Sequence, residues 1–263
     1  MDSTRRGFLK IAGLSVLGLG AKPVADAMAG SGEVKYEPDP KVLKGKRWAM
    51  VVDFKACAKA KDGCIDCVTA CHNVHNVPEF NNPKDEVKWI WKASFEEAFP
   101  TQANKFIEEH VHEAAKSKPF MVLCNHCDNP PCVRVCPVKA TFQTADGIVM
   151  MDYHRCIGCR YCMAACPYGS RSLNWRDPRP FIKKENPEFP SRTRGVVEKC
   201  NFCAERLAVG KIPACVEACK EHKALTFGDL EDPNSEVRAL LRKHASIQRK
   251  PQLGTRPEVY YIV

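Results

Sequence analysis

Eight of the sixteen cysteines in this 263-residue chain lie between residues 124 and 166, and they fall into two short runs. The runs are Cys124-x2-Cys127-x4-Cys132-x3-Cys136-Pro137 and Cys156-x2-Cys159-x2-Cys162-x3-Cys166-Pro167. Two intervening residues let a chain curl around one centre, so that successive sulfur atoms face the same point. The proline after each fourth cysteine fixes φ and removes a hydrogen-bond donor, which helps to end the segment there. The spacing therefore predicts thiolate ligands gathered around compact inorganic centres.

The second of these runs has the spacing found in bacterial ferredoxins. In that spacing three cysteines bind one [4Fe-4S] cluster and the fourth binds a neighbouring cluster, so one run implies a partner run. Two further runs exist, Cys57-x6-Cys64-x2-Cys67-x3-Cys71 and Cys200-x2-Cys203-x11-Cys215-x3-Cys219. The first run carries an insertion after Cys57, and His72 and Lys220 stand where proline would be expected. These departures affect the loop geometry more than the ligands.

Zinc ions and disulfide bonds are the two alternative uses of these cysteines. Structural zinc sites usually present two Cys-x2-4-Cys pairs separated by a longer loop, whereas the run from Cys156 to Cys166 places four ligands within eleven residues. Disulfide bonds are typical of exported proteins, but cysteines three residues apart in one turn are poorly placed to pair with each other. The spacing favours iron-sulfur clusters over both alternatives.

The number of residues between the runs indicates which of them share clusters. Nineteen residues separate the second run from the third, against fifty-two between the first and second and thirty-three between the third and fourth. Closing the shortest loop costs the least entropy, so runs two and three are expected to form one module and runs one and four the other. Exchange of the fourth cysteine within each pair predicts four ligand sets: Cys57, Cys64, Cys67 and Cys219; Cys71, Cys200, Cys203 and Cys215; Cys124, Cys127, Cys132 and Cys166; and Cys136, Cys156, Cys159 and Cys162. All sixteen cysteines are used, so none is expected to be catalytic.

The runs also alternate in type, as an internal duplication would leave them. Val52-Asp53-x3-Cys57 matches Met151-Asp152-x3-Cys156, and Cys124-Asn125-His126-Cys127 matches Cys200-Asn201-Phe202-Cys203. We expect an α+β fold of two stacked bacterial-ferredoxin-like (4Fe-4S dicluster) modules with loop and helix insertions. The expected division is module A at 47–71 plus 196–228, an insertion at 72–119, module B at 120–167, a Pro-rich loop at 168–195 and a C-terminal extension at 229–263.

Apolar patterns outside the runs predict short elements. Strands are expected at 47–53, 88–92 and 223–228, and helices at 104–116 and 235–244. Residues 168–199 carry four prolines and no apolar periodicity, which predicts a long surface loop that faces a partner. His75, His110 and His112 are given no role, because surface histidines are far more common than ligands. No run of eighteen apolar residues occurs, so the chain is not expected to span a membrane by itself.

The first thirty residues form a separate segment. Residues 4–10, Thr-Arg-Arg-Gly-Phe-Leu-Lys, are a twin-arginine signal, followed by the apolar residues 11–21 and a small-residue pattern that predicts cleavage after Ala29. An uncleaved anchor is the alternative, although eleven apolar residues are too few to cross hydrocarbon, which takes about twenty. Residues 30–46 are expected to form a polar linker. The signal predicts export of the folded, cluster-loaded protein to the periplasmic side of the membrane.

The chain has a formal net charge of +9, a value that suggests a nucleic-acid partner. Removal of residues 1–29 takes away four basic and two acidic groups and leaves +7. Each cubane with four thiolates carries roughly −2 when oxidised, so four clusters bring the total near zero. We therefore interpret the basic excess as counter-charge that holds and tunes the clusters. Neither a nucleic acid nor a small-molecule substrate is expected as a partner.

With all four runs in view, residues 47–228 resemble the four-cluster ferredoxin subunits that accompany molybdopterin oxidoreductases, polysulfide and tetrathionate reductases and related membrane complexes. That family also pairs the first run with the fourth and the second with the third. The twin-arginine signal, the expanded first run and the loop from Asn174 to Pro190 look most like the DsrO-type periplasmic subunit.

The resemblance implies a non-catalytic electron-transfer subunit with four [4Fe-4S] clusters. It implies two partners, a periplasmic multihaem cytochrome c and a quinone-interacting integral membrane subunit of the NrfD type, in a respiratory complex linked to sulfate and sulfite reduction. The alternative is the electron-transfer (beta) subunit of a periplasmic molybdopterin oxidoreductase, such as a polysulfide or tetrathionate reductase. A zinc-binding scaffold protein is the third hypothesis.

Overall fold

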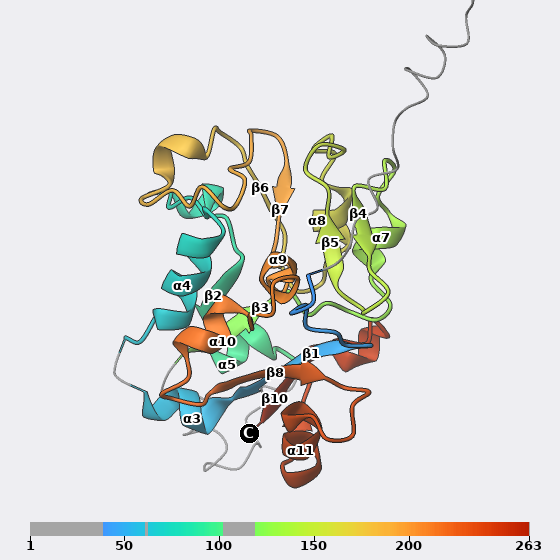
Figure 1. Ribbon diagram of the computed structural model, residues 1–263. Coiled ribbons are helices and arrows are strands. Elements are labelled where there is room, and N and C mark those ends of the chain that lie inside the picture. The colour runs from blue at the N-terminus through green and yellow to red at the C-terminus, as the bar shows by residue number, and fades with distance from the viewer. Residues whose placement is uncertain (1–38, 61–62, 102–118, 263) are drawn as a thin grey trace, which may run out of the picture. The chain divides into compact units, whose positions relative to one another are not determined.

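The computed structural model describes residues 39–60, 63–101 and 119–262 (Figure 1). Contacts divide the chain after Asp39, and the unit that begins at Pro40 is the one considered below. The predicted signal peptide, residues 30–38 of the predicted linker and the predicted helix at 104–116, with His110 and His112, lie outside the described residues. Within the described ranges, no helix is both long enough and apolar enough to cross a membrane.

The secondary structure consists of short elements, and most cysteines lie within them or at their ends. The strands are β1 Trp48–Asp53, β2 Ile90–Ala93, β3 Phe120–Leu123, β4 Thr141–Gln143, β5 Val149–Met151, β6 Ser172–Leu173, β7 Val197–Glu198, β8 Leu225–Asp229, β9 Ser246–Ile247 and β10 Val259–Ile262. The helices are α3 Phe54–Lys59, α4 Asp66–Val74, α5 Phe95–Ala98, α7 Pro131–Arg134, α8 Tyr161–Ala165, α9 Ala204–Leu207, α10 Ala214–Ala218 and α11 Glu236–Lys243. Three 3-10 turns are η1 Pro83–Asp85, η2 Arg179–Phe181 and η3 Pro251–Leu253 among the described residues.

A mixed sheet of order β8-β1-β10-β9 lies beside the first and fourth cysteine runs (Figure 1). β1 pairs antiparallel with β8 and parallel with β10. Because side chains alternate along a strand, Met50 and Val52 face the main core while Ala49 and Val51 face α11. Both faces of β1 are therefore covered, which explains its unbroken apolar run.

The predicted strands at 47–53, 88–92 and 223–228 and the predicted helix at 235–244 are confirmed as β1, β2, β8 and α11. The helix begins where the Ser235 hydroxyl accepts a hydrogen bond from the Arg238 amide, as N-cap residues do. Val237 on its buried face packs against Ala49 and Val51 of β1. The α+β class is confirmed too.

Aromatic side chains join segments that the sequence left outside the modules. Phe54 at the start of α3 contacts Phe95, Phe99 and Phe120, with ring centroids 4.1–6.1 Å apart, and Tyr261 of β10 lies 5.5 Å from it. These rings come from both the predicted insertion and the predicted C-terminal extension. Parts of both segments thus belong to the main core, because β10 supplies an inner strand of the sheet and β2 pairs with β3.

The second and third runs surround a small hairpin, β4–β5, with α7 and α8 beside it (Figure 1). Val149 and Met151 of β5, Leu173 of β6 and Val197 of β7 form a separate apolar cluster there, and Cys132 and Cys162 belong to it. The few apolar side chains in this region are thus grouped directly against cysteines.

The segment 168–199 has more order than the predicted surface loop. β6 and β7 pair antiparallel, and η2 forms one turn between them. The Asn76 amide, just after α4, donates to the backbone carbonyls of Asn186 (2.9 Å) and Phe189 (2.6 Å). Side-chain to backbone hydrogen bonds of this kind leave no trace in apolar periodicity, which is why the sequence pattern indicated only a loop.

Candidate metal centres

Four cysteines from the first and fourth runs, Cys57, Cys64, Cys67 and Cys219, line one cavity of about 320 Å³ and are called the Cys57 set. Cys57 lies in α3, whose first turn is fixed because the Asp53 carboxylate accepts a hydrogen bond from the Ala56 amide (2.9 Å). Lys92 Nζ, from β2, donates to Cys57 Sγ over 3.3 Å. A cation thus adjoins this set of sulfur atoms.

Two similar cavities, of about 320 and 280 Å³, lie between the second and third runs. The first is lined by the Cys124 set, which comprises Cys124, Cys127, Cys132 and Cys166. The second is lined by the Cys156 set, which comprises Cys136, Cys156, Cys159 and Cys162. The fourth cysteine of each run therefore lies in the other run's cavity, as the predicted exchange requires.

Cys71, Cys200, Cys203 and Cys215 form the Cys200 set. Burial raises the pKa of Cys71, and the other three thiols of the set raise it further. Helices α4 and α10 pack against each other, and each carries two cysteines four residues apart, a spacing that puts them on one face. Each helix presents one of these cysteines to the Cys57 set and the other to the Cys200 set.

The pKa values of the thiols indicate what the cavities hold. Burial raises the pKa of Cys67, Cys127 and Cys200 to about 12, so four thiolates would not persist together in such a space without metal cations, which deprotonate the thiols they bind. A single zinc ion holds its four sulfur ligands about 2.3 Å away and leaves no cavity among them. Four sulfur atoms around a space of about 300 Å³ fit a cubane cluster instead.

The sets follow one another in a single order. Beyond burial, which is the main cause, Cys67 contributes to the raised pKa of Cys215, and Cys124 contributes to that of Cys200. The Cys57 set therefore neighbours the Cys200 set, which neighbours the Cys124 set. The Cys124 and Cys156 sets adjoin within the second and third runs. The sequence did not specify this order.

Lys199 is a buried cation between the Cys200 and Cys124 sets. It is 1% exposed, and its Nζ donates to the carbonyl oxygens of Val149 and, over 2.5 Å, Cys200. Burial lowers the pKa of Lys199, while Cys124 and Cys200 oppose that shift. The ammonium is thus solvated by backbone dipoles in place of water and adjoins thiols on both sides.

Arg171 has the corresponding place between the Cys124 and Cys156 sets. It is 4% exposed, and its Nη2 donates to Cys132 Sγ over 3.0 Å. Cys132 and Cys162, one from each set, raise its pKa against the opposing effect of burial. Lys92, Lys199 and Arg171 were missed by the sequence analysis. The only signal was the overall basic excess, which does not identify positions.

The two cysteine modules meet through residues that are equivalent in the internal repeat. His126 and Phe202 occupy the same place in their runs, both have a left-handed backbone, with φ of 41° and 54°, and their rings stack with centroids 3.7 Å apart. Both side chains are fully buried. This contact brings Cys124 and Cys200, two residues earlier in each run, close to each other.

His75 differs from the expectation of a surface histidine. It is 1% exposed, and its ring stacks on Trp89. Nδ1 lies 2.9 Å from the Cys71 carbonyl oxygen and Nε2 lies 2.8 Å from a Glu205 carboxylate oxygen. Both ring nitrogens thus have partners within the fold, and His75 connects α4 to α9 beside the Cys200 set.

Sequence comparisons agree with this arrangement of cysteines. Two family models, both described as a 4Fe-4S dicluster domain, match residues 116–180 and 155–225. The chain belongs to the 4Fe-4S dicluster family of iron-sulfur electron-transfer subunits. The predicted fold of two such modules and the predicted four [4Fe-4S] clusters are confirmed.

Named relatives are subunits of oxidoreductases. The chain is 41% identical to the Hdr-like menaquinol oxidoreductase iron-sulfur subunit 1 of Archaeoglobus fulgidus, over 98% of this chain and 97% of that protein. It is 35% identical to a tetrathionate reductase subunit of Salmonella typhimurium, over 100% of this chain and 89% of that protein. It is 38% identical to protein NrfC of Escherichia coli, over 84% and 82% of the two chains. The chain is thus an iron-sulfur electron-transfer subunit of an oxidoreductase complex.

Proposed function

We propose that each cysteine set binds one [4Fe-4S] cluster and that the clusters form one electron path in the order Cys57, Cys200, Cys124 and Cys156 set. The observation that carries this proposal is the single spatial order of the sets. Residues 47–71 with 196–228 then form module A, and residues 120–167 form module B. Because each iron has four ligands within its cluster, the protein transfers electrons and leaves chemistry on substrates to other subunits.

We further propose that the chain is exported through the twin-arginine route and acts at the periplasmic side of the cytoplasmic membrane. There it relays electrons between a membrane quinone-interacting subunit of the NrfD type and a periplasmic multihaem cytochrome c, as a DsrO-type subunit of a complex linked to sulfite reduction. Support comes from the twin-arginine motif and from the 41% identity, over nearly both full lengths, to a protein named as a menaquinol oxidoreductase subunit.

A second candidate partner is a periplasmic molybdopterin enzyme. The 35% identity to a tetrathionate reductase subunit over the whole chain favours it. In that case the same row of clusters connects a catalytic subunit with the membrane. The two candidates differ in their partners and not in the chemistry of this chain.

Iron and acid-labile sulfide per chain are the first measurement, on protein matured anaerobically in a host that assembles clusters. Four cubanes predict about sixteen of each, with coupled S = 1/2 EPR signals on reduction. About eight iron atoms would contradict the ligand sets, and stoichiometric zinc without iron would support the scaffold hypothesis instead.

Purification of the intact complex from native membranes distinguishes the partners. The proposal predicts covalently bound haem c and an NrfD-type subunit, with cluster reduction by a menaquinol analogue. A molybdopterin subunit in place of haem c would support the second candidate. The fraction of chain recovered from the periplasmic side of spheroplasts tests the export.

A further inference from the structure

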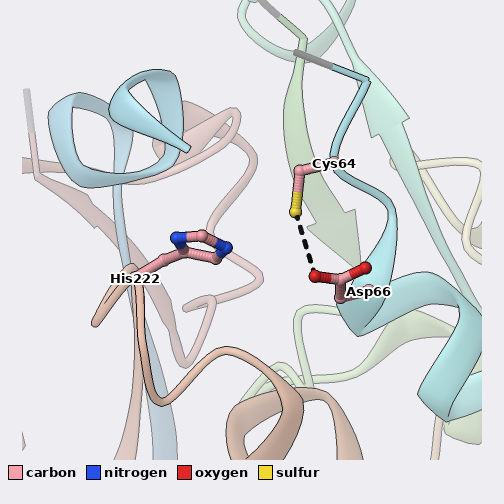
Figure 2. A group of neighbouring side chains, drawn as sticks. All are labelled: Cys64, Asp66 and His222. Atoms are coloured by element: carbon pink, nitrogen blue, oxygen red, sulfur yellow. Dashed lines mark hydrogen bonds between the residues drawn. The ribbon is translucent and has the colours of Figure 1, made fainter. Parts of the chain in front are cut away.

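Cys64 has two additional metal-binding side chains beside it. The Cys64 Sγ, a carboxylate oxygen of Asp66 and a ring nitrogen of His222 all lie within 4.8 Å of one another. Figure 2 shows the three side chains directed towards a common point, with Sγ 3.7 Å from the nearer Asp66 oxygen. Thiolate, carboxylate and imidazole together are a donor set that protein metal sites use.

The backbone fixes these side chains independently of one another. Asp66 is the first residue of α4, and Cys64 precedes it by two residues. His222 lies in the turn after α10, where its amide donates to the Cys219 carbonyl oxygen over 3.1 Å. His222 therefore comes from the segment that supplies the fourth cysteine of the same set.

Both additional side chains line the cavity of the Cys57 set. The cavities of the Cys124 and Cys156 sets have no carboxylate or imidazole among their described lining residues. The Cys57 set thus has more possible iron ligands than a cubane needs, and the surplus lies at one cysteine.

We propose that His222, together with Asp66, is a reserve ligand for the cluster iron that Cys64 holds. The proposal rests on the ligand sets proposed above. In the exchange the Fe–S bond to Cys64 breaks and a bond from the same iron to the His222 nitrogen or an Asp66 oxygen forms, with no change in the oxidation state of the cluster. Imidazole replaces thiolate on iron in Rieske centres, so the chemistry has precedent.

The physical consequence concerns iron retention. A cubane iron that loses its only protein ligand is exposed to solvent and is released, which leaves a [3Fe-4S] cluster. Cys64 is partly exposed, unlike the buried Cys67 of the same set. A second donor within reach keeps that iron in place when the thiolate is lost.

The test compares two cysteine variants at equivalent positions, each the second ligand of its run. Cys64→Ala is expected to retain about sixteen iron atoms per chain and to lack the EPR signal of an oxidised [3Fe-4S] cluster. Cys159→Ala is the matched control, and it is expected to lose one iron and gain that signal. The triple variant Cys64→Ala, Asp66→Ala, His222→Ala is expected to behave like the control.

Pulsed EPR on reduced Cys64→Ala, labelled with 15N-histidine, identifies the new ligand directly. A strong histidine-nitrogen coupling that His222→Ala removes is the expected result, and loss of iron on Asp66→Ala alone assigns the ligand to the carboxylate instead. Conversion of Cys64→Ala to a [3Fe-4S] cluster overturns the proposal. So does retention of all iron in the triple variant, because water or an added thiol then fills the position.

A second measurement holds if Cys64→Ala does not accumulate. His222→Ala with Asp66→Ala, and all sixteen cysteines intact, is expected to load about sixteen iron atoms but to release iron to a chelator faster than the unmutated chain. Equal release rates overturn the proposal. Failure of the unmutated chain to bind about sixteen iron atoms would instead refute the proposed ligand sets, so the two failures are distinguishable.

Discussion

Three cations beside the cysteine sets are the residues that only the structure identifies. Lys92, Lys199 and Arg171 each contact or adjoin cluster ligands, and the latter two are almost fully buried. A buried cation is costly unless nearby negative charge compensates it. Clusters with thiolate ligands supply that charge, so the cations and clusters stabilise each other, and each cation favours the reduced, more negative state of its neighbours.

Replacement of Lys199 by methionine is expected to lower the reduction potentials of the two clusters on either side of it. The loss of one elementary charge worth about 1.4 kcal/mol corresponds to roughly 60 mV for a one-electron couple. EPR-monitored redox titration measures the change. Lys183→Met is the control, because that side chain is 75% exposed and water screens its charge. Equal potentials in Lys199→Met and the unmutated protein would contradict the role.

The ion pair between Arg192 and Glu198 holds the segment 168–199 in place. Both side chains are at most 1% exposed, and Nη2 lies 2.5 Å from the carboxylate. Arg192 also donates to the backbone carbonyl of Asn76 (2.9 Å), just after α4. Glu198 accepts a hydrogen bond from the Trp89 indole (2.8 Å). The pair therefore ties three segments together.

Glu198→Gln leaves the buried guanidinium without its counter-charge, which is expected to cost about 3–5 kcal/mol. The loss is expected as a lower midpoint of thermal unfolding and as faster proteolysis within residues 168–195. Asp177→Asn removes an exposed pair with Arg179 and serves as control with little expected change. Similar melting of both variants would mean that the buried pair adds nothing.

At the scale of elements, the turn of the third run depends on a glycine for two reasons. Gly158 has φ of +68°, and a Cβ there would clash with the carbonyl oxygen of Gly195, the residue that precedes the short strand β7 by two positions. The close approach packs the end of the loop 168–195 against the turn that carries Cys156 and Cys159. Only glycine permits both the left-handed backbone and the contact.

Gly158→Ala is expected to disturb the Cys156 set and reduce iron in that cluster, measured as iron per chain and as the loss of one EPR component. Gly169→Ala is a matched control because its φ is +66° but nothing lies within 4 Å of the added Cβ. The control is expected to cost only the backbone strain, about 1–2 kcal/mol, with all clusters retained. Iron loss in both variants would assign the effect to strain alone.

At the scale of the whole molecule, the fold places a pair of equivalent runs at its centre. His126 and Phe202 stack between the second and fourth runs, so the Cys124 and Cys200 sets are inner and the Cys57 and Cys156 sets are outer. The outer sets are also the ones whose cysteines include partly exposed members from the first and third runs. Electrons therefore enter and leave at opposite ends of the row.

Cluster loading is expected to change the net charge of the molecule. The chain without residues 1–29 carries +7, and four clusters at roughly −2 each bring it near −1. Native isoelectric focusing of the mature protein, with and without clusters, measures the difference as a large acidic shift on loading. An unchanged isoelectric point would contradict the number of clusters.

The sequence by itself determined the chemistry and the local elements. Ligand spacing is a local property, so the runs around Cys57, Cys124, Cys156 and Cys200 predicted clusters before any fold was known, and alternation in β1 and periodicity in α11 predicted those elements. The helix at 104–116 and the signal peptide stay predictions. So do the individual ligand assignments, although the structure brings each predicted set together.

Tertiary structure alone decided the order of the sets, the places of Lys199 and Arg171, the inner position of β10 and the approach of His222 to Cys64. Each of these depends on contacts between residues distant in the chain, made by side chains whose partners no periodic pattern names. Lys199 illustrates the reason: in the sequence it is one basic residue among forty, and only burial between two sets of thiols distinguishes it from a solvated lysine.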